Sequence, residues 1–163
     1  MPSMFTDLND IQIGSVAVAD GTAEALTAVE DMADYDEITW IVLFEDVDAA
    51  AVLTLAPKSN TADSTSTPTP VAISLVGGTV SGAVTAVVTT GASVITEASG
   101  NLDNLMAVVN VAKSKISARY VFLSITATVE SFAIASIITI KSRAGSVPVT
   151  QSTDVASLVK SAS

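Results

Sequence analysis

The segment from Arg119 to Ile140 has the composition of two β-strands, and its first half places different side chains on alternate positions with a period of two. Successive side chains of an extended strand point to opposite faces, so its first half places an apolar row on one face. That row is Val121, Leu123, Ile125, Ala127 and Val129. β-branched and aromatic residues fill the segment, and neither Pro nor Gly interrupts it. We therefore expect a β-hairpin with strands over 119–129 and 132–140, joined tightly at Glu130-Ser131.

The second strand of this expected hairpin is apolar on both faces. One face carries Phe132, Ile134, Ser136, Ile138 and Ile140, and the other carries Ala133, Ala135, Ile137 and Thr139. Such a strand is typical of a sheet with a sandwich core on one side and a neighbouring subunit on the other. The pattern predicts that Phe132, Ile134 and Ile138 contact another subunit or a binding partner.

Further strand-like segments and turn signals fill the rest of the chain. The clearest is 37–45, whose heavier apolar face contains Trp40 as an expected core anchor. A returning strand over 51–56 is expected to complete a hairpin or meander that Pro57 ends. Segment 22–29 favours a strand, with a helix as the alternative because Ala and Glu favour helix. Short strands with little helix predict an all-β fold, an antiparallel β-sandwich resembling a jelly roll.

The expected organisation has three parts. Residues 1–15 lack a sustained period and are predicted to be an extended N-terminal arm, either disordered alone or ordered on a partner. Its expected contact residues are Phe5, Leu8 and Ile11. A single β-sandwich domain is expected over 16–151, with a polar, Pro-containing loop at 59–70, and a C-terminal tail over 152–163.

The composition argues against several classes of function. The chain has no Cys and no His, which removes disulfides, thiolate sites, the usual general base and the usual zinc ligands. A net charge of −10 argues against a nucleic-acid partner. No stretch offers ~18–20 apolar residues without regular Ser or Thr, so no membrane span is expected. The N-terminus has acids where a secretion signal needs bases. We expect no enzymatic activity, no cofactor and no metal.

Acidic residues concentrate in residues 1–57, which carry twelve acids and no Lys or Arg. The remaining residues carry seven bases and five acids. The acidic residues of 1–57 form either a solvated face or a surface that docks on a basic partner. The basic cluster of Lys113, Lys115 and Arg119 is expected to be a solvated or subunit-facing patch.

Two groups of carboxylates are weaker candidates for chemistry. The turns at 45–48 and 31–36 offer oxygens to calcium, although the EF-hand spacing is missing. The pairs Glu30/Glu37 and Glu97/Glu130 are nominal acid–base pairs for glycoside hydrolysis, but the chain has few aromatic residues to line a sugar cleft. Solvated turn carboxylates are the favoured interpretation of both groups.

Several short motifs occur in a fixed order along 32–151. They are the turn Ala33-Asp34-Tyr35-Asp36 before an apolar strand, the polar insertion at 59–70, Arg119-Tyr120-Val121, the small-residue strand 131–140, and Arg143 through Pro148 to Gln151. In this arrangement the chain resembles small virion proteins of tailed bacteriophages, namely capsid decoration (cement) or auxiliary head proteins.

The resemblance implies a mechanical function. Such a protein binds the assembled head and stabilises the joints between capsomers, because a ligand of the shell shifts the assembly equilibrium toward the shell. The implied partners are the major capsid protein and further copies of the chain, with a homotrimer favoured. The implied location is the capsid surface of the virion, after synthesis in the host cytoplasm. Two alternatives remain open: another virion component such as a head fibre, tail or connector protein, or a carbohydrate-binding β-sandwich module.

Overall fold

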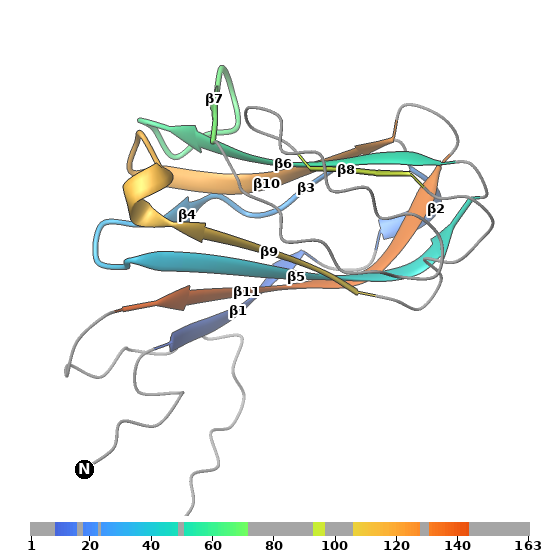
Figure 1. Ribbon diagram of the computed structural model, residues 1–163, viewed down its shortest axis with the longest axis horizontal. Coiled ribbons are helices and arrows are strands. Elements are labelled where there is room, and N and C mark those ends of the chain that lie inside the picture. Colours follow the sequence, from blue (N-terminus) through green and yellow to red (C-terminus); the bar gives the residue numbers. More distant parts are fainter. Residues whose placement is uncertain are drawn as a thin grey trace, which may run out of the picture.

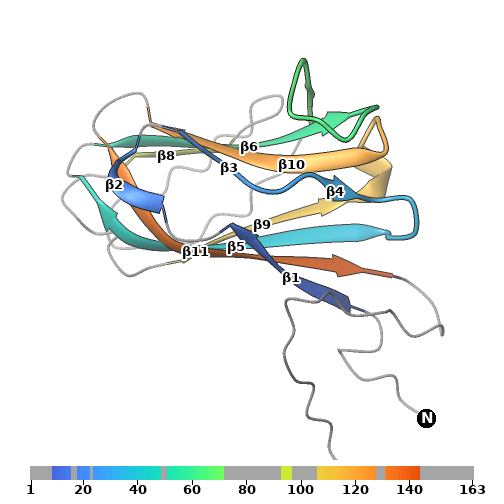
Figure 2. The same cartoon turned by 180° about the vertical axis from the view of Figure 1, so that it is seen from behind.

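The computed structural model describes residues 9–15, 18–22, 24–48, 51–71, 93–96, 106–127 and 131–143. These residues form two antiparallel sheets that lie one above the other in Figure 1 and, from behind, in Figure 2. The predicted all-β sandwich class is confirmed.

Each sheet is built from strands that are distant in sequence. Sheet A contains β1 (Asn9–Ser15), β2 (Val18–Thr22), β5 (Glu37–Val47), β9 (Met106–Ala112) and β11 (Phe132–Ser142). Its order is β1-β11-β5-β9, and β2 also pairs with β11. Sheet B contains β3 (Glu24–Leu26), β4 (Glu30–Asp31), β6 (Val52–Asn60), β7 (Thr69–Pro70), β8 (Ser93–Thr96) and β10 (Tyr120–Ala127). Its order is β3-β10-β6-β7, with β4 on β10 and β8 on β6. A short 3-10 helix, η1 (Lys113–Lys115), follows β9.

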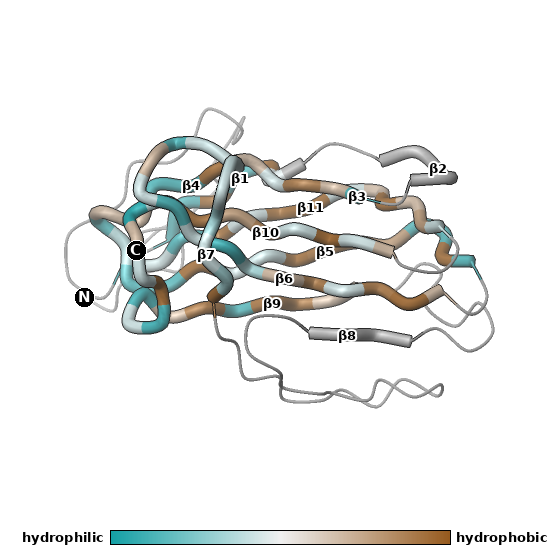
Figure 3. The backbone as a smooth tube through the Cα atoms, turned by 90° about the horizontal axis from the view of Figure 1, so that it is seen from above, coloured by the Kyte–Doolittle hydropathy of each residue, from teal (hydrophilic) through white to brown (hydrophobic). Residues whose placement is uncertain are grey.

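The core lies between the sheets and follows from strand alternation. In β5 every second residue from Ile38 to Phe44 is buried, and Trp40 is the predicted core anchor, now confirmed as fully buried. Leu53 and Leu55 of β6 and alternate residues of β10 complete the opposite side. Figure 3 shows the corresponding alternation of hydrophobic and hydrophilic positions along the strands.

The two expected hairpins are wrong. β10 and β11 are consecutive strands, but β10 pairs with β3, β4 and β6 in sheet B, whereas β11 pairs with β1, β2 and β5 in sheet A. The strands β5 and β6 are likewise in different sheets. A period of two fixes which face of a strand is apolar, but it does not determine the partner strand. In both places the chain crosses between the layers.

A β-bulge changes the faces of β11. Its pairing with β5 shifts register between Ala133 and Ile134 and again between Ile134 and Ser136. Phe132, Ala133 and Ile134 are therefore all buried, whereas Ile138 lies on the outer face. The prediction that Phe132 and Ile134 share an exposed contact face with Ile138 is wrong, because the bulge breaks the strict alternation on which it rested.

Residues 9–15 of the predicted arm form a strand instead, with a register shift between Ile13 and Ser15. β1 pairs antiparallel with β11 at one edge of sheet A, and the Cα of Ile11 lies opposite that of Ile140. Gly14 lets the two strands approach closely, since a Cβ there would collide with the side-chain oxygen of Thr139. Residues 1–8, which include Phe5 and Leu8, and the tail 152–163 lie outside the described residues.

Three smaller predictions have different outcomes. The strand expected within 22–29 is present as β3, so the helical alternative is not realised. Pro57 does not end β6. The Pro57 carbonyl accepts a hydrogen bond from the Val71 N–H at 3.0 Å, on the edge of β6 that faces away from β10. The amide position of a strand residue points the same way as its carbonyl, so the missing N–H of Pro57 leaves the β10 ladder intact. The loop predicted over 59–70 is confirmed only over 61–67, because Ser59 and Asn60 belong to β6 and Thr69-Pro70 forms β7 paired with it.

Candidate functional site

The outer face of sheet A is apolar across all four strands of its main path. Strand register places Ile13, Ile138, Ile41 and Val108 in one row, one residue from each of β1, β11, β5 and β9. Val108 is 54% exposed and Ile13 is 53% exposed. We define the outer apolar face as Ile11, Ile13, Ile41, Leu43, Met106, Val108, Ile138 and Ile140. All eight are exposed or half-buried, and none belongs to the core.

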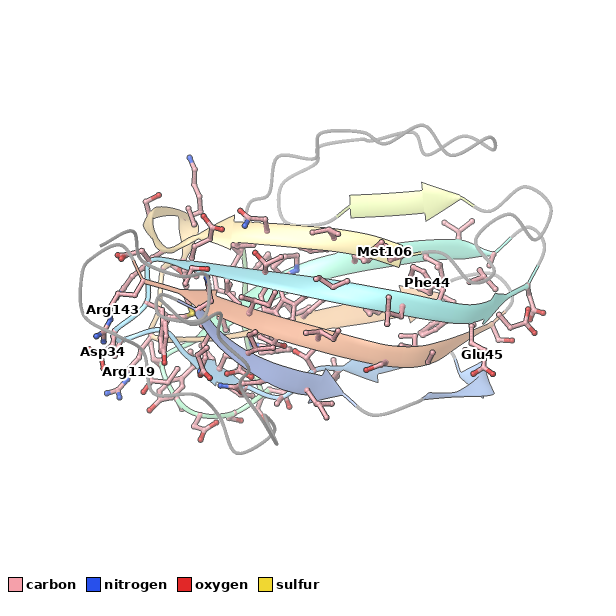
Figure 4. The ribbon with its side chains drawn as sticks, turned by 90° about the horizontal axis from the view of Figure 1, so that it is seen from below. Asp34, Phe44, Glu45, Met106, Arg119 and Arg143 are labelled. Carbon is pink, nitrogen blue, oxygen red and sulfur yellow. The ribbon has the colours of Figure 1, made fainter. Side chains whose placement is uncertain are left out.

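Polar groups mark both ends of the outer apolar face. At one end Asn110 donates hydrogen bonds to Glu37 Oε1 at 2.6 Å and to Thr39 Oγ1 at 2.8 Å. Beyond Met106 at the other end, Glu45 is exposed on β5. In Figure 4 Met106 and Glu45 lie at the end of the sheet opposite to Asp34, Arg119 and Arg143. An uncharged centre between polar ends is the usual composition of a protein interface.

The size of this face limits what it can do alone. Four strands at about 4.8 Å spacing and three rows of outward residues give a footprint of roughly 400 Å², and the eight apolar residues occupy about two thirds of it. The apolar part is therefore close to the lower end of the range of about 300–600 Å² for the largest apolar patch of a monomer, which is often functional. The whole footprint is about half of the ~800 Å² that each partner contributes to a stable pair. Binding through this face is therefore weak unless several copies bind together.

The second notable feature is a buried ion cluster that links the two sheets. We call Lys141, Asp10, Glu30 and Tyr35 the Lys141 cluster. Lys141 on β11 places its Nζ 2.9 Å from Glu30 Oε2 on β4 and 3.4 Å from Asp10 Oδ2 on β1. The Tyr35 ring covers the ammonium, with its centroid 4.8 Å from Nζ. Because β1 and β11 belong to sheet A and β4 to sheet B, the cluster ties the layers together.

The electrostatics of the cluster follow from burial and opposite charges. Burial by itself lowers the pKa of Lys141, but the carboxylates of Glu30 and Asp10 outweigh it, so the net effect raises the pKa of Lys141 above its usual value. Burial, together with the negative charge of Asp10, raises the pKa of Tyr35. In the ion-paired state Lys141 is therefore a cation and Tyr35 a neutral phenol at physiological pH.

Exposed ion pairs fix the 31–36 turn next to this cluster. Arg119 binds Asp31 through two nitrogens, at 2.8 Å from Nε and 2.5 Å from Nη2. Arg143 donates from Nε to the Asp34 carbonyl at 2.7 Å, and its guanidinium lies 5.9 Å from the centre of the Tyr35 ring. Figure 4 shows Asp34, Arg119 and Arg143 gathered at one end of the molecule. The turn is thereby held over the Lys141 cluster.

The Asp31–Arg119 pair predicts a small loss of stability in acid. The Arg119 guanidinium holds the pKa of Asp31 at about 2, below its usual 3.8. A lowered folded-state pKa stabilises the protein above the unfolded value, and this contribution is lost as pH falls through about 2. D31N should therefore lower Tm slightly at pH 6 and not at pH 2. The effect is small because the Asp31 side chain is 40% exposed.

The control for this prediction is D63N, which changes an exposed carboxylate in the 61–67 loop. Thermal unfolding of the three proteins, followed by circular dichroism at both pH values, gives the comparison. An equal Tm difference for D31N at pH 6 and pH 2 would contradict the assigned role of Asp31.

Several of the carboxylates considered for calcium or for hydrolysis bind protein groups. Asp48 Oδ2 accepts the Ser131 hydroxyl at 2.5 Å and the Ser131 N–H at 3.2 Å. Glu30 binds Lys141 and Glu37 binds Asn110, so this pair does not converge on a common cleft. Glu97 and Glu130 lie outside the described residues. Across the described ranges, no three Asp or Glu side chains gather in a way that would hold a metal ion.

The predicted contact residues are in three different environments. Ile11 and Ile138 lie on the outer apolar face, where Ile11 is opposite Ile140 and Ile138 is opposite Ile41. Phe132 and Ile134 are fully buried in the core. Phe5 and Leu8 lie outside the described residues. Two of the six predicted residues therefore remain candidates on a described surface.

Sequence reasoning missed the Lys141 cluster and six of the eight residues of the outer apolar face. Ile137, Thr139 and Lys141 are alternate residues of one strand, so Lys141 should point into the sandwich as the other two do. This spacing is the one local signal that Lys141 is buried. A charged residue in an inward phase requires a partner. Nothing local identifies Asp10 or Glu30 as that partner, because the contacts exist only after β1 and β4 have joined their sheets.

In the part of the chain that the structure describes, no helix is long and apolar enough to cross a membrane. Two features of the described residues can support a function: the outer apolar face and the Lys141 cluster. Both are taken from this chain alone, since comparison with models of known protein families, with curated proteins and with solved structures found no match.

Proposed function

We propose that this chain is a structural protein that acts by binding to a large assembly, and specifically that it is a capsid decoration protein of a tailed bacteriophage. The observation that carries the proposal is the outer apolar face, with Val108 and Met106 54% and 65% exposed. A chain of net charge −10 that still leaves such a face to solvent gains from covering it. The choice of a capsid as the assembly rests on the sequence resemblance.

The occupant of the outer apolar face is a flat, uncharged patch on the major capsid protein. A contact of roughly 400 Å² is too small for a stable pair of free proteins. It becomes effective on a shell that presents the same patch many times, because the contacts act together once the binder is oligomeric. We therefore include a homo-oligomer in the proposal, with a trimer favoured, since a symmetric trimer presents three such faces.

Binding requires no movement of the sandwich. The outer apolar face lies on four paired strands, β1, β11, β5 and β9, which Figure 1 shows in one layer, and β5, β9 and β11 contribute residues to the core behind it. A rigid surface loses little conformational entropy when it binds, so more of the apolar contact is available for affinity. This is the property required of a protein that fastens the joints of a shell.

The test is cosedimentation with capsids. Head particles that lack this protein, produced from the genome that encodes it, are mixed with the purified chain. We expect saturable binding in hundreds of copies per particle. The double variant M106K/V108K places charge in the contact and should weaken binding at least tenfold, because a desolvated unpaired charge is strongly unfavourable. The control is L26K, which changes an exposed apolar residue on β3 of the other sheet.

Circular dichroism confirms that the variants fold before binding is compared. Absence of binding by the wild-type chain at every concentration overturns the proposal. So does equal binding by wild type and M106K/V108K. Binding of only a handful of copies per particle also overturns it, and indicates a fibre, tail or connector component instead.

A further inference from the structure

The first and last described strands bring a lysine and an aspartate together in a protected place. Asp10 on β1 and Lys141 on β11 are direct partners in the antiparallel register. Their side chains point into the sandwich and are only 6% and 8% exposed. The Lys141 Nζ lies 3.4 Å from Asp10 Oδ2, which places the amine directly beside the carboxyl group whose carbon it would attack.

A second carboxylate completes the arrangement from the opposite sheet. Glu30 Oε2 lies 2.9 Å from the same Nζ, and the Glu30 side chain is 4% exposed. This is hydrogen-bond distance, so Glu30 can accept a proton from the ammonium and return it to another atom of the site.

Neutral groups orient the aspartate. The Gln12 amide donates to Asp10 Oδ2 at 2.7 Å, and the Tyr35 hydroxyl donates to the same oxygen at 3.4 Å. The Tyr35 ring lies over the Lys141 ammonium. Donors on the carboxyl oxygen stabilise negative charge that develops there during attack on its carbon. An amine, an oriented carboxyl group and a proton carrier thus lie together, largely away from water.

We propose that Lys141 and Asp10 condense into an intramolecular amide, an isopeptide bond that joins β11 to β1, with Glu30 as the general acid–base. The proposal is independent of the function proposed above. A static ion pair is the other interpretation of the same geometry, and the two differ in composition by one molecule of water.

The chemical balance requires no co-reactant. Glu30 takes a proton from the Lys141 ammonium, and the freed lone pair of Nζ attacks Cγ of Asp10. The tetrahedral intermediate then loses one carboxyl oxygen as water, with Glu30 carrying protons from nitrogen to that oxygen. The ammonium has three hydrogens: two leave in the water and one stays on the amide nitrogen. One N–C bond forms, one C–O bond breaks, and nothing is oxidised or reduced.

Burial supplies the driving force for this condensation. In water an amine and a carboxylate stay ionised and apart, whereas well-oriented groups held together within one molecule reach effective concentrations of about 10⁵–10⁸ M. Two opposite charges in a low-dielectric interior become a neutral amide, which removes the penalty of keeping both ions desolvated. The exclusion of water also opposes the reverse hydrolysis.

The test is the intact mass of the folded full-length chain. We expect it to be one water lighter than the mass that the sequence gives, and proteolysis should release a branched peptide that joins segments of β1 and β11. K141R keeps the positive charge but removes the nucleophile, so it should have its full sequence mass. E30Q should slow the reaction by on the order of a hundredfold. The matched control E37Q changes a carboxylate paired with Asn110 and should still lose one water.

D10N provides a second, independent readout. Asparagine condenses with lysine by releasing ammonia instead of water, so the cross-linked product of D10N should have the same mass as cross-linked wild type. A static arrangement predicts the unreacted asparagine mass. This variant tests the chemistry even where K141R alters folding.

One side reaction has the same mass and needs its own control. Asp20-Gly21 is a sequence that can close to a succinimide with loss of one water. Mildly alkaline incubation reopens a succinimide but leaves an amide intact, and D20A removes the site. A full sequence mass in the folded wild type overturns the proposal. So does a mass deficit that alkali reverses, that D20A abolishes, or that persists in K141R.

Discussion

Replacing Lys141 with Met is expected to lower the free energy of unfolding by about 3–5 kcal/mol. The substitution removes the cation between Glu30 and Asp10, at 2.9 and 3.4 Å, and leaves two buried carboxylates without it. Their desolvation is then no longer offset by attraction to the ammonium. The result is expected whether the wild-type link is ionic or covalent. Urea unfolding followed by tryptophan fluorescence measures it, with Trp40 as the probe.

Two comparisons make the K141M result specific. K115M changes an exposed lysine of η1 and should alter stability by less than about 0.5 kcal/mol. K141M/E30Q should recover part of the loss, because it removes one of the two buried charges along with their partner. If K141M and K115M unfold at the same urea concentration, the Lys141 cluster does not hold the sheets together.

Trp40→Ala is expected to lower the free energy of unfolding by about 3–5 kcal/mol. Trp40 is fully buried in the middle of β5, with its side chain in the main core between the sheets. Truncation removes its apolar contacts and leaves a cavity that packed strands on both sides cannot fill. Chemical unfolding followed by far-ultraviolet circular dichroism measures the change, since the variant has no tryptophan.

Trp40→Phe separates packing from hydrogen bonding at the same position. Among the described residues the indole Nε1 of Trp40 has no hydrogen-bond partner, so replacing it removes no such bond. We expect W40F to lose only about 1–2 kcal/mol, from reduced volume. Equal losses for W40F and W40A would mean that the indole nitrogen makes an essential contact, contrary to the geometry.

The sequence predicts the faces of strands in this protein better than it predicts their neighbours. Alternation identified Trp40 and the buried side of β5, because period two follows directly from backbone geometry. Pairing depends on which strands meet in three dimensions, so β10 and β11 were expected to pair although they lie in different sheets. The bulge at Ala133 and Ile134 reverses which residues of β11 point into the core on either side of it. No residue pattern in 132–140 indicates this bulge.

The candidate sites were predictable in unequal parts. The apolar character of both faces of 132–140 indicated an unusual outer surface, and Ile138 does lie there. Met106 and Val108 join it through pairing of β9 with β5, which local patterns do not specify. The Lys141 cluster depends on residues from three strands, separated by most of the chain. Electrostatic partners of this kind can be identified only when the pairing register of the strands is known.

The topology also determines when this protein can complete its fold during synthesis. β10 and β11 are central strands of the two sheets and lie at residues 120–142, so each sheet is completed only by a late segment of the nascent chain. Until they leave the ribosome, β1, β3 and β4 lack their partner strand, and β5 and β6 each keep one free edge that is open to other molecules. Contacts so distant in sequence also form slowly. Translation rate near these codons, and chaperones that shield the earlier strands, therefore influence the yield of native protein.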